Sequence, residues 1–308
     1  RRGDSCRIGP PVRERQAGTI LVGDPQDPEE VWDLMKDHLR SIIAQETNPL
    51  LARNLVREYA QARILQALQE AGAFMAWIFH GGTALRLLYQ LPRFSEDLDF
   101  SLAESSIAGD FAKVVASVRK AFEAEAYAVA VRRFKETPPV KSAFLAFPGL
   151  FHELGMSPHR TEALSIKIEL DCRPPEGGST EISVVRRFVI LNILHYDRAS
   201  MLSGKLHALL MRPYTKGRDL YDLFWYVSDP SWPDPNFRFL NEALRQTGWT
   251  GPEITSMNWK AELIKKIERI AWRRAIDDVR PFIEREADLD QLSRENVLRL
   301  LESRSSHP

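Results

Sequence analysis

Two aspartates separated by a single residue carry the strongest chemical signal in the sequence. Asp97 and Asp99 lie in the run DLDFSL, whose alternation predicts a β-strand over 97–102. Side chains two residues apart on a strand share a face, so the two carboxylates should lie side by side. Like charges this close repel one another unless a cation lies between them, and hard oxygen ligands suit Mg²⁺ or Mn²⁺. The pair therefore predicts a site for a divalent metal.

A turn rich in glycine precedes the aspartates. Gly81, Gly82 and Thr83 separate a short apolar run at 76–79, which predicts a buried strand, from helical spacing over 83–89. The backbone amides at the start of such a helix are donors that favour a phosphate group. An Asp-x-Asp pair alone is ordinarily solvated surface, but its combination with this turn indicates a site for a metal and a nucleotide.

Further carboxylates lie on another predicted strand. The segment 164–171 alternates apolar residues with four polar ones that share the opposite face, namely Ser165, Lys167, Glu169 and Asp171. Periodicity does not separate Glu169 from Asp171, because both lie on that face.

Charged residues in the second half of the chain could act on the phosphates. Lys205 stands in an otherwise apolar helical stretch, and Asp219 and Asp222 share a face of the next predicted helix. Arg218 at the start of that helix opposes the helix dipole, which favours a paired or ligand-facing position. We therefore include Arg218 among the residues expected to bind the nucleotide.

The elements that must position these residues follow from hydrophobic periodicity. A helix is expected from Asp27 through Ile43, where Asp27 can act as the cap and Pro28 fits the first helical position. The other elements expected before residue 196 are helices at 51–71 and 110–125 and strands near 127–134, 140–147 and 181–191. Beyond it, helices are expected near 198–212, 218–228, 237–246, 259–278 and 293–303.

This order of elements predicts an α+β fold with two domains. We expect a flexible leader over 1–26, an α+β domain with a small mixed sheet over 27–195, and a helical C-terminal domain over 196–308 that closes the cleft.

Composition places few limits on partners. Lys+Arg and Asp+Glu number 42 each, so net charge neither indicates nor excludes a nucleic acid. The two cysteines, Cys6 and Cys172, are too few for a disulfide framework or a four-ligand zinc site, and reduced thiols in the cytoplasm are expected. No apolar run approaches the about 18 residues that cross a bilayer, so no membrane partner is expected.

Clusters of basic and aromatic residues could suit an RNA backbone with stacked bases; they lie at 132–135, 141, 186–187 and 212–218.

Two runs of the sequence resemble a known family. GGTALRLLYQLPRFSEDLDFSL, which begins at Gly81, is similar to the first motif of the AbiEii/AbiGii toxin family, within the DNA polymerase β-like nucleotidyltransferase superfamily. KLHALLMR at 205–212, followed by RDLYDL from Arg218, resembles the downstream motifs, and the resemblance spans roughly residues 50–230. The superfamily more often has Gly-Ser where this chain has Gly81-Gly82, so a phosphate contact by that serine would fall to Thr83 or Ser95.

The resemblance implies a nucleotidyltransferase fold and a metal-dependent reaction. A nucleoside triphosphate would give its nucleotide to an acceptor, with Mg²⁺ or Mn²⁺ bound by Asp97, Asp99 and Glu169. Glu169 is preferred as the third ligand because it follows an apolar-Lys-apolar run, as the family's acidic residue does. Lys205 would contact the triphosphate, and Asp222 would orient Lys205 or the substrate.

The resemblance also implies a biological role. The chain would be the toxin of a type IV toxin–antitoxin system or of phage abortive infection, with tRNA or another RNA as acceptor and a cognate antitoxin as partner. Two alternatives stay open: transfer to a small molecule or a protein, and a non-catalytic interaction protein that retains the fold. The intact Asp97/Asp99 pair argues against the second, whereas net charge does not decide the first.

Overall fold

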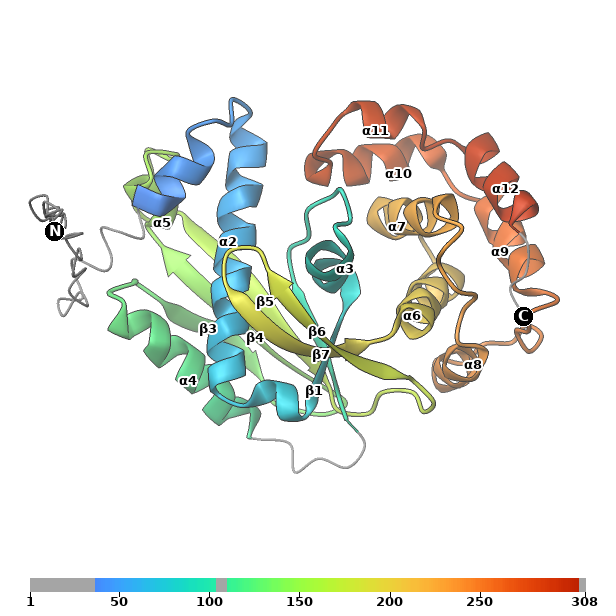
Figure 1. Ribbon diagram of the computed structural model, residues 1–308, viewed down its shortest axis with the longest axis horizontal. Helices are drawn as coiled ribbons and strands as arrows, with labels where there is room; N and C mark the ends of the chain where they lie inside the picture. The colour runs from blue at the N-terminus through green and yellow to red at the C-terminus, as the bar shows by residue number, and fades with distance from the viewer. Residues whose placement is uncertain (1–36, 104–109, 305–308) are drawn as a thin grey trace, which may run out of the picture.

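A seven-stranded mixed sheet forms the centre of the first half of the chain (Figure 1). The computed structural model describes residues 37–103 and 110–304, and the sheet has the strand order β3-β4-β5-β2-β1-β7-β6. Only β1·β7 and β2·β5 pair in parallel; all other neighbours are antiparallel. The strands are β1 (Trp77–His80), β2 (Leu98–Leu102), β3 (Ala130–Lys135), β4 (Val140–Pro148), β5 (Ala163–Asp171), β6 (Thr180–Arg186) and β7 (Ile190–Tyr196).

Helices α2 (Pro49–Glu70) and α4 (Phe111–Ala124) pack on each other and against the sheet. The start of α2 follows from its sequence: the Asn48 side chain accepts hydrogen bonds from the amides of Leu50 and Leu51, and Pro49 occupies the first helical position. The helix ends before Gly72, which adopts the left-handed conformation (φ +76°) that glycine tolerates best. Short elements complete this half: η1 (Ala73–Met75), α3 (Gly81–Tyr89) and α5 (Leu150–Glu153).

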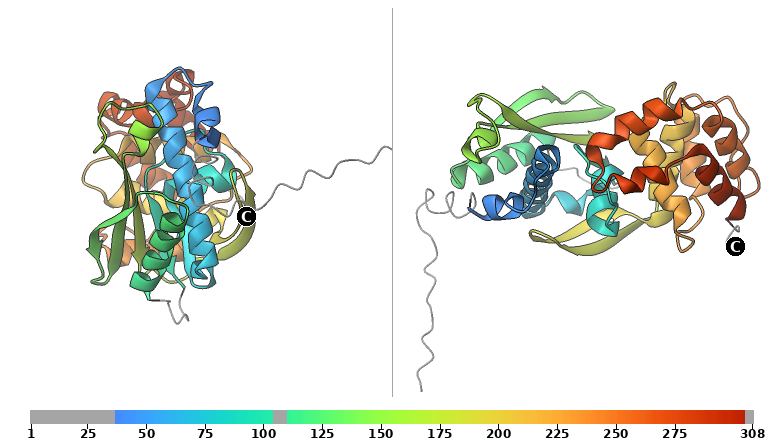
Figure 2. Two further views of the ribbon diagram at one scale, coloured as in Figure 1. Left: turned by 90° about the vertical axis from the view of Figure 1, so that its left-hand side faces the viewer. Right: turned by 90° about the horizontal axis from the view of Figure 1, so that it is seen from above.

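The second half of the described chain is helical. These helices gather beside one end of the sheet, as the view from above shows (Figure 2). They are α6 (Arg198–Met211), α7 (Gly217–Ser228), α8 (Phe237–Gln246), α9 (Trp259–Ile267), α10 (Trp272–Val279), η2 (Arg280–Phe282), α11 (Ala287–Asp290) and α12 (Arg294–Ser303). None of the helices in the described ranges is both long and apolar enough to cross a membrane.

The predicted α+β class is confirmed, whereas two predicted elements are wrong. The single strand expected at 181–191 is a hairpin of β6 and β7. Its turn at 187–189 contains no Gly, Pro or Asn, so the sequence carries no local signal for the change of direction. The helix expected at 259–278 is two helices, and the indole Nε1 of Trp272 donates to the carbonyl oxygen of Ile267 at the break. The expected leader and the first residues of the helix predicted from Asp27 lie outside the described residues; 37–43 are helical.

The segment between α3 and β2 is tied to the C-terminal helices. The amide of Phe94 donates to the carbonyl oxygen of Phe282 at 2.7 Å, and Arg93 forms an isolated antiparallel bridge with Ile283. On the nearby α2, the Asn54 side chain donates to the carbonyl oxygen of Pro281 at 3.0 Å. The chain just before the predicted catalytic strand is therefore held by residues of the C-terminal half, and α2 contacts the same part of that half.

Helices α7 and α10 approach each other most closely at Gly217. A Cβ atom at this position would lie 1.8 Å from the carbonyl oxygen of Ala275, which is far inside van der Waals contact. The Gly217 amide donates to the Asp278 carboxylate at 2.7 Å across the same contact. Only glycine fits here, because the obstacle is backbone that cannot rotate away.

Candidate active site

Adjacent strands bring two of the predicted carboxylates side by side. In the parallel pair β2·β5, Asp99 lies opposite Glu169, and Ser101 lies opposite Asp171. Leu98 and Phe100 alternate with the aspartates and are buried on the other face of β2, which fixes the orientation of Asp99. Asp97 directly precedes the strand. The register thus pairs Asp99 with Glu169 rather than with Asp171.

The aspartates carry charge that the protein only partly neutralises. Burial raises the pKa of Asp97 to about 6, and the negative charges of Asp99 and Glu96 add to this shift. Burial also raises the pKa of Asp99 to about 6, with a further contribution from the charge of Glu169. A site in which ionised carboxylates are destabilised in this way favours a bound cation.

Lys167 supplies one positive charge among these carboxylates. Its ammonium group pairs with Glu169 two residues along β5. Burial lowers the pKa of Lys167, but the hydrogen bond and charge of Glu169, together with Asp97 and Asp99, outweigh burial and raise the pKa overall. Within the described part of the chain, no three Asp, Glu, His or Cys side chains converge as a ready-made metal centre. Glu169, Asp97 and Asp99 are nevertheless each near enough to Lys167 for their charges to raise its pKa.

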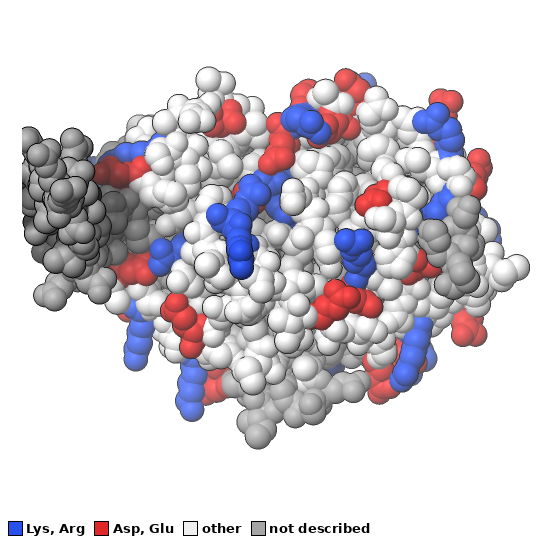
Figure 3. Space-filling model, viewed as in Figure 1, with Lys and Arg blue, Asp and Glu red and all other residues white. Residues whose placement is uncertain are grey.

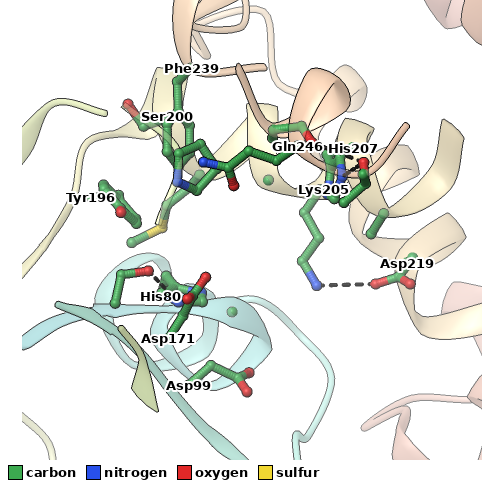
Figure 4. A pocket seen from close by; sticks show the side chains of 18 of the residues that line it. His80, Asp99, Asp171, Tyr196, Ser200, Lys205, His207, Asp219, Phe239 and Gln246 are labelled. Atoms are coloured by element: carbon green, nitrogen blue, oxygen red, sulfur yellow. Dashed lines mark hydrogen bonds and ion pairs between the residues drawn. The ribbon is translucent and has the colours of Figure 1, made fainter. Parts of the chain in front are cut away.

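A pocket of about 380 Å³ opens between the sheet and the helices. Its lining includes Gly81, Asp99, Glu169, Asp171 and Lys205. Figure 4 shows Asp99 and Asp171 on one side of the cavity and the ammonium of Lys205 directed into it from α6. The volume lies in the range of small-ligand sites. Both candidates for the third carboxylate therefore reach the same cavity.

Lys205 belongs to a buried network of ion pairs. Its Nζ lies 2.7 Å from Asp222 Oδ2 and 3.3 Å from Asp219 Oδ1. Asp222 is fully buried and also accepts two hydrogen bonds of 2.6 Å from the Arg93 guanidinium, which is 2% exposed. Burial lowers the pKa of Lys205, but Asp222 and Asp219 outweigh this effect and raise it overall. Lys205 is thus held charged and in one place at the edge of the pocket.

The glycine turn at 81–83 packs closely against Asp99 of β2 and against the segment that precedes it. Gly81 has φ +79°, and a Cβ there would lie 2.3 Å from Asp99 Oδ2, so conformation and space both require glycine. Gly82 is packed against Arg93 and Ser95, since a Cβ there would lie 2.8 Å from a side-chain atom of each. Of the turn residues, Gly81 alone is part of the pocket lining.

Besides Gly82, three residues expected to bind the nucleotide lie outside the pocket lining. Thr83 is buried, and its hydroxyl donates to the carbonyl oxygen of Asp97 at 2.5 Å. Arg218 pairs with Glu96 at 2.9 Å and lies over the Phe282 ring. Ser95 lies beside Gly82 and also contributes no atom to the lining. In this structure Thr83 and Arg218 stabilise the segment around the aspartates instead of facing the cavity.

Sequence reasoning assigned no role to three residues that the structure brings to the site. Arg93 holds Asp222, and Lys167 lies among the carboxylates. His80 lines the pocket and contacts the Ser101 hydroxyl at 3.1 Å; burial lowers its pKa to about 4, so the imidazole is neutral at physiological pH. Arg93 stands inside the motif GGT…RFSEDLD, which is the one sequence signal that could have identified it.

Comparison with known proteins identifies the family. The family model for nucleotidyl transferase AbiEii toxins of type IV toxin–antitoxin systems matches residues 63–295, whereas no curated protein matches the chain. The fold is similar to MenT4, a nucleotidyltransferase toxin from Mycobacterium tuberculosis H37Rv, with a TM-score of 0.53 and 16% identity over 86% of this chain and 89% of that one. JHP933 from Helicobacter pylori has a TM-score of 0.47 and 20% identity over 81% and 89% of the two chains. The chain belongs to the AbiEii nucleotidyltransferase toxin family and is a nucleotidyltransferase.

Proposed function

We propose that this enzyme transfers a nucleotide from a nucleoside triphosphate to a hydroxyl group of an RNA, with tRNA as the acceptor and Mg²⁺ or Mn²⁺ as the cofactor. The observation that carries the proposal is the register of Asp99 beside Glu169, with Lys205 directed into the same pocket. Acidic groups that could bind a metal and a cation that could bind phosphate therefore line one cavity, which supports the proposal.

The donor set suits a divalent metal. Asp97, Asp99 and Glu169 offer only oxygen ligands, which Mg²⁺ and Mn²⁺ prefer. The raised pKa values of the two aspartates support a bound cation, because ionisation is unfavourable without one. Lys167 would turn away from Glu169 when these residues bind the metal. The bound metal would lower the pKa of the attacking hydroxyl and neutralise the leaving pyrophosphate.

The chain's own residues would bind and orient the triphosphate. In the reaction, the acceptor hydroxyl loses its proton to solvent as its oxygen bonds to the α-phosphorus, the bond from that phosphorus to the bridging oxygen breaks, and pyrophosphate leaves with its electron pair. Lys205 would contact the phosphates as a point charge, since Asp219 and Asp222 keep it protonated. The backbone amide of Gly81, at the start of α3, would donate to a phosphate oxygen.

The loop between α6 and α7 supports an RNA acceptor. Arg212 lines the pocket, and Lys216 is near enough for its charge to lower the pKa of Asp99. Between them Tyr214 is 64% exposed, so its ring is available for stacking on a base. On the face that Figure 3 shows, acidic and basic residues are interspersed without a broad basic field, which favours contact through a local element such as this loop.

The family also supports a role as a toxin. The matching family model describes toxins of type IV systems, and we propose that a cognate antitoxin opposes this enzyme's activity in the cell. Modification of an RNA needed for translation would account for toxicity without any further activity of the chain.

A labelling experiment tests the proposed reaction. The purified protein is incubated with Mg²⁺, total RNA and each nucleoside triphosphate, labelled in parallel at the α- or the γ-phosphate. Label from the α-phosphate should enter the tRNA fraction, and label from the γ-phosphate should appear in pyrophosphate. Asp99→Asn should abolish the transfer, whereas Asp277→Asn, a control on the exposed surface of α10, should retain it.

The label also distinguishes the alternatives. Transfer of the γ-label to RNA would mean phosphoryl transfer and would contradict the proposal. Incorporation of the α-label into protein or a small molecule would keep nucleotidyl transfer and replace the acceptor. Full activity of Asp99→Asn would remove the proposed metal site.

A further inference from the structure

We propose that the part of the pocket formed by α6 and α8 is the nucleobase subsite for the triphosphate, and that Gly204 keeps this subsite open. The inference rests on the proposed function and deepens it by assigning residues to the recognition of the base. Its place in the molecule is clear in Figure 4, where Phe239 and Gln246 lie across the cavity from Asp99 and Asp171.

Small residues form part of the wall that α6 contributes. Ser200, Gly204 and Ala208 follow one another at intervals of four residues, so they form one stripe along the helix, and all three line the pocket beside larger side chains of α6. Helix α8 packs against α6 and contributes Phe239, Ala243 and Gln246, with Thr247 directly after it. The small-residue stripe therefore leaves room between the two helices.

Gly204 is exposed, and no contact with the residues that the structure describes requires a glycine there. It lies in the interior of α6, where glycine is less stable than alanine because of its conformational freedom. Outside the neighbouring backbone of α6, no heavy atom of the described residues lies within 4 Å of the place where a Cβ would be, and φ is not in the left-handed region. Gly81 and Gly217, by contrast, are each required by a close neighbour. Because alanine would fit the free protein, the missing side chain points to a ligand that occupies the space.

The side chains in the part of the pocket formed by α6 and α8 fit a planar ring with a polar edge. Tyr196 and Phe239 are almost fully buried and pack together with ring centroids 5.0 Å apart, and Met201 adds an apolar surface beside them. The Gln246 side chain makes no hydrogen bond with other described residues and extends over the cavity in Figure 4. Its amide offers both a donor and an acceptor, which suits the edge of a nucleobase.

The phosphate groups have a separate place in the pocket. Lys205 follows Gly204 directly and is directed toward Asp219, on the side where the Asp219 pair with Arg212 also lies. A nucleotide with its phosphates between Lys205 and the carboxylates would thus have its base near Gly204. Triphosphate binding and base recognition should be separable by mutation.

The test compares nucleoside triphosphates with inorganic tripolyphosphate, which has no base. Binding is measured by calorimetry in the presence of Mg²⁺ and without an acceptor. Gly204→Leu should weaken binding of all four nucleoside triphosphates by about tenfold or more, and should leave tripolyphosphate binding unchanged. Gly204→Ala should raise the melting temperature and still weaken nucleotide binding, so a folding defect cannot account for the loss.

A second variant tests whether Gln246 recognises the nucleobase. Gln246→Ala should change the order of preference among the four triphosphates without affecting tripolyphosphate. The control is Arg245→Ala, since Arg245 is adjacent, exposed and paired with Glu242 outside the pocket lining.

The results separate this inference from the proposed function. Nucleotide binding by Gly204→Leu at the wild-type affinity would overturn the base subsite while leaving the transfer reaction intact. Failure of the wild-type protein to bind either nucleotides or tripolyphosphate would overturn the proposed function, and the subsite with it.

Discussion

The carboxylates of Asp97 and Asp99 are partly buried, and their negative charges repel each other. This repulsion affects stability as well as metal binding. Each folded-state pKa is about 6, above the ordinary value of 3.8. The folded protein therefore holds protons more tightly than the unfolded chain between these two values. The contribution of the pair to stability rises as the pH falls from 7 through about 6 toward 4.

Removing one of the two charges should stabilise the metal-free protein. We expect Asp97→Asn to have a higher melting temperature than the wild type at pH 7 in EDTA, since the variant loses a repelling charge. The difference should shrink as the pH approaches 4, where the wild-type carboxylates are protonated, and Mg²⁺ should stabilise only the wild type strongly. Melting curves at several pH values check this; a variant less stable than the wild type at pH 7 would show that the repulsion is already compensated.

Glu169 and Asp171 both reach the pocket, but only Glu169 lies opposite Asp99. We expect Glu169→Gln to lose nucleotide transfer almost completely across a magnesium titration, because a metal ligand is lost. Asp171→Asn should retain most of the activity and serves as the matched variant. The opposite ranking would move the third metal ligand two residues along β5.

Among elements, the segment between α3 and β2 depends most on its neighbours. Arg93 in this segment and Asp222 on α7 form a bidentate ion pair that is almost completely buried. A buried charge without its partner costs far more than an exposed one. The segment thus joins the strand that bears Asp99 to the helix that positions Lys205.

Substitution of Arg93 should reveal this dependence. We expect Arg93→Met to lower the free energy of unfolding by about 3–5 kcal/mol, since Asp222 would keep only Lys205 as a partner. Arg218→Met is the control, because Arg218 and its partner Glu96 are partly exposed, and it should cost about 1 kcal/mol or less. Urea denaturation of both variants checks the contrast. Equal losses would mean that the buried pair contributes no more than the exposed one.

Elements and residues with a local signal could be predicted from the sequence, and those set by distant contacts could not. The strand with Asp99, the helix with Lys205 and the α+β class follow from alternation, helical spacing and the family motif, and α8 begins and ends where its periodicity indicates. The β2·β5 register and the roles of Arg93 and Lys167 arise only when segments far apart in sequence meet. The turn between β6 and β7 lacks the residues that usually mark a reversal.

At the scale of the whole molecule, the two halves share the site. The carboxylates come from the sheet, Lys205 and Asp222 come from the helices, and η2 holds the segment around Phe94. The boundary at residue 195 stays a prediction, but a fragment limited to the sheet would lack Lys205. We therefore expect activity to depend on how the helices are placed against one another as well as on the sheet.

A mutation at Gly217 can test in cells how activity depends on the placement of the helices. A methyl group at this position would meet the Ala275 carbonyl and push α7 from α10, an overpacking that typically costs about 1–3 kcal/mol. Since α7 carries Asp219 and Asp222, Gly217→Ala should give a temperature-sensitive allele: growth arrest on induction in the cool and normal colonies in the warm. Asp99→Asn, the comparison strain, should grow at both temperatures. Arrest by Gly217→Ala at both temperatures would show that the helices can separate without loss of toxicity. The expected pattern would give a strain in which a rise in temperature alone inactivates the toxin. Growth of that strain at the low temperature could then select suppressor mutations.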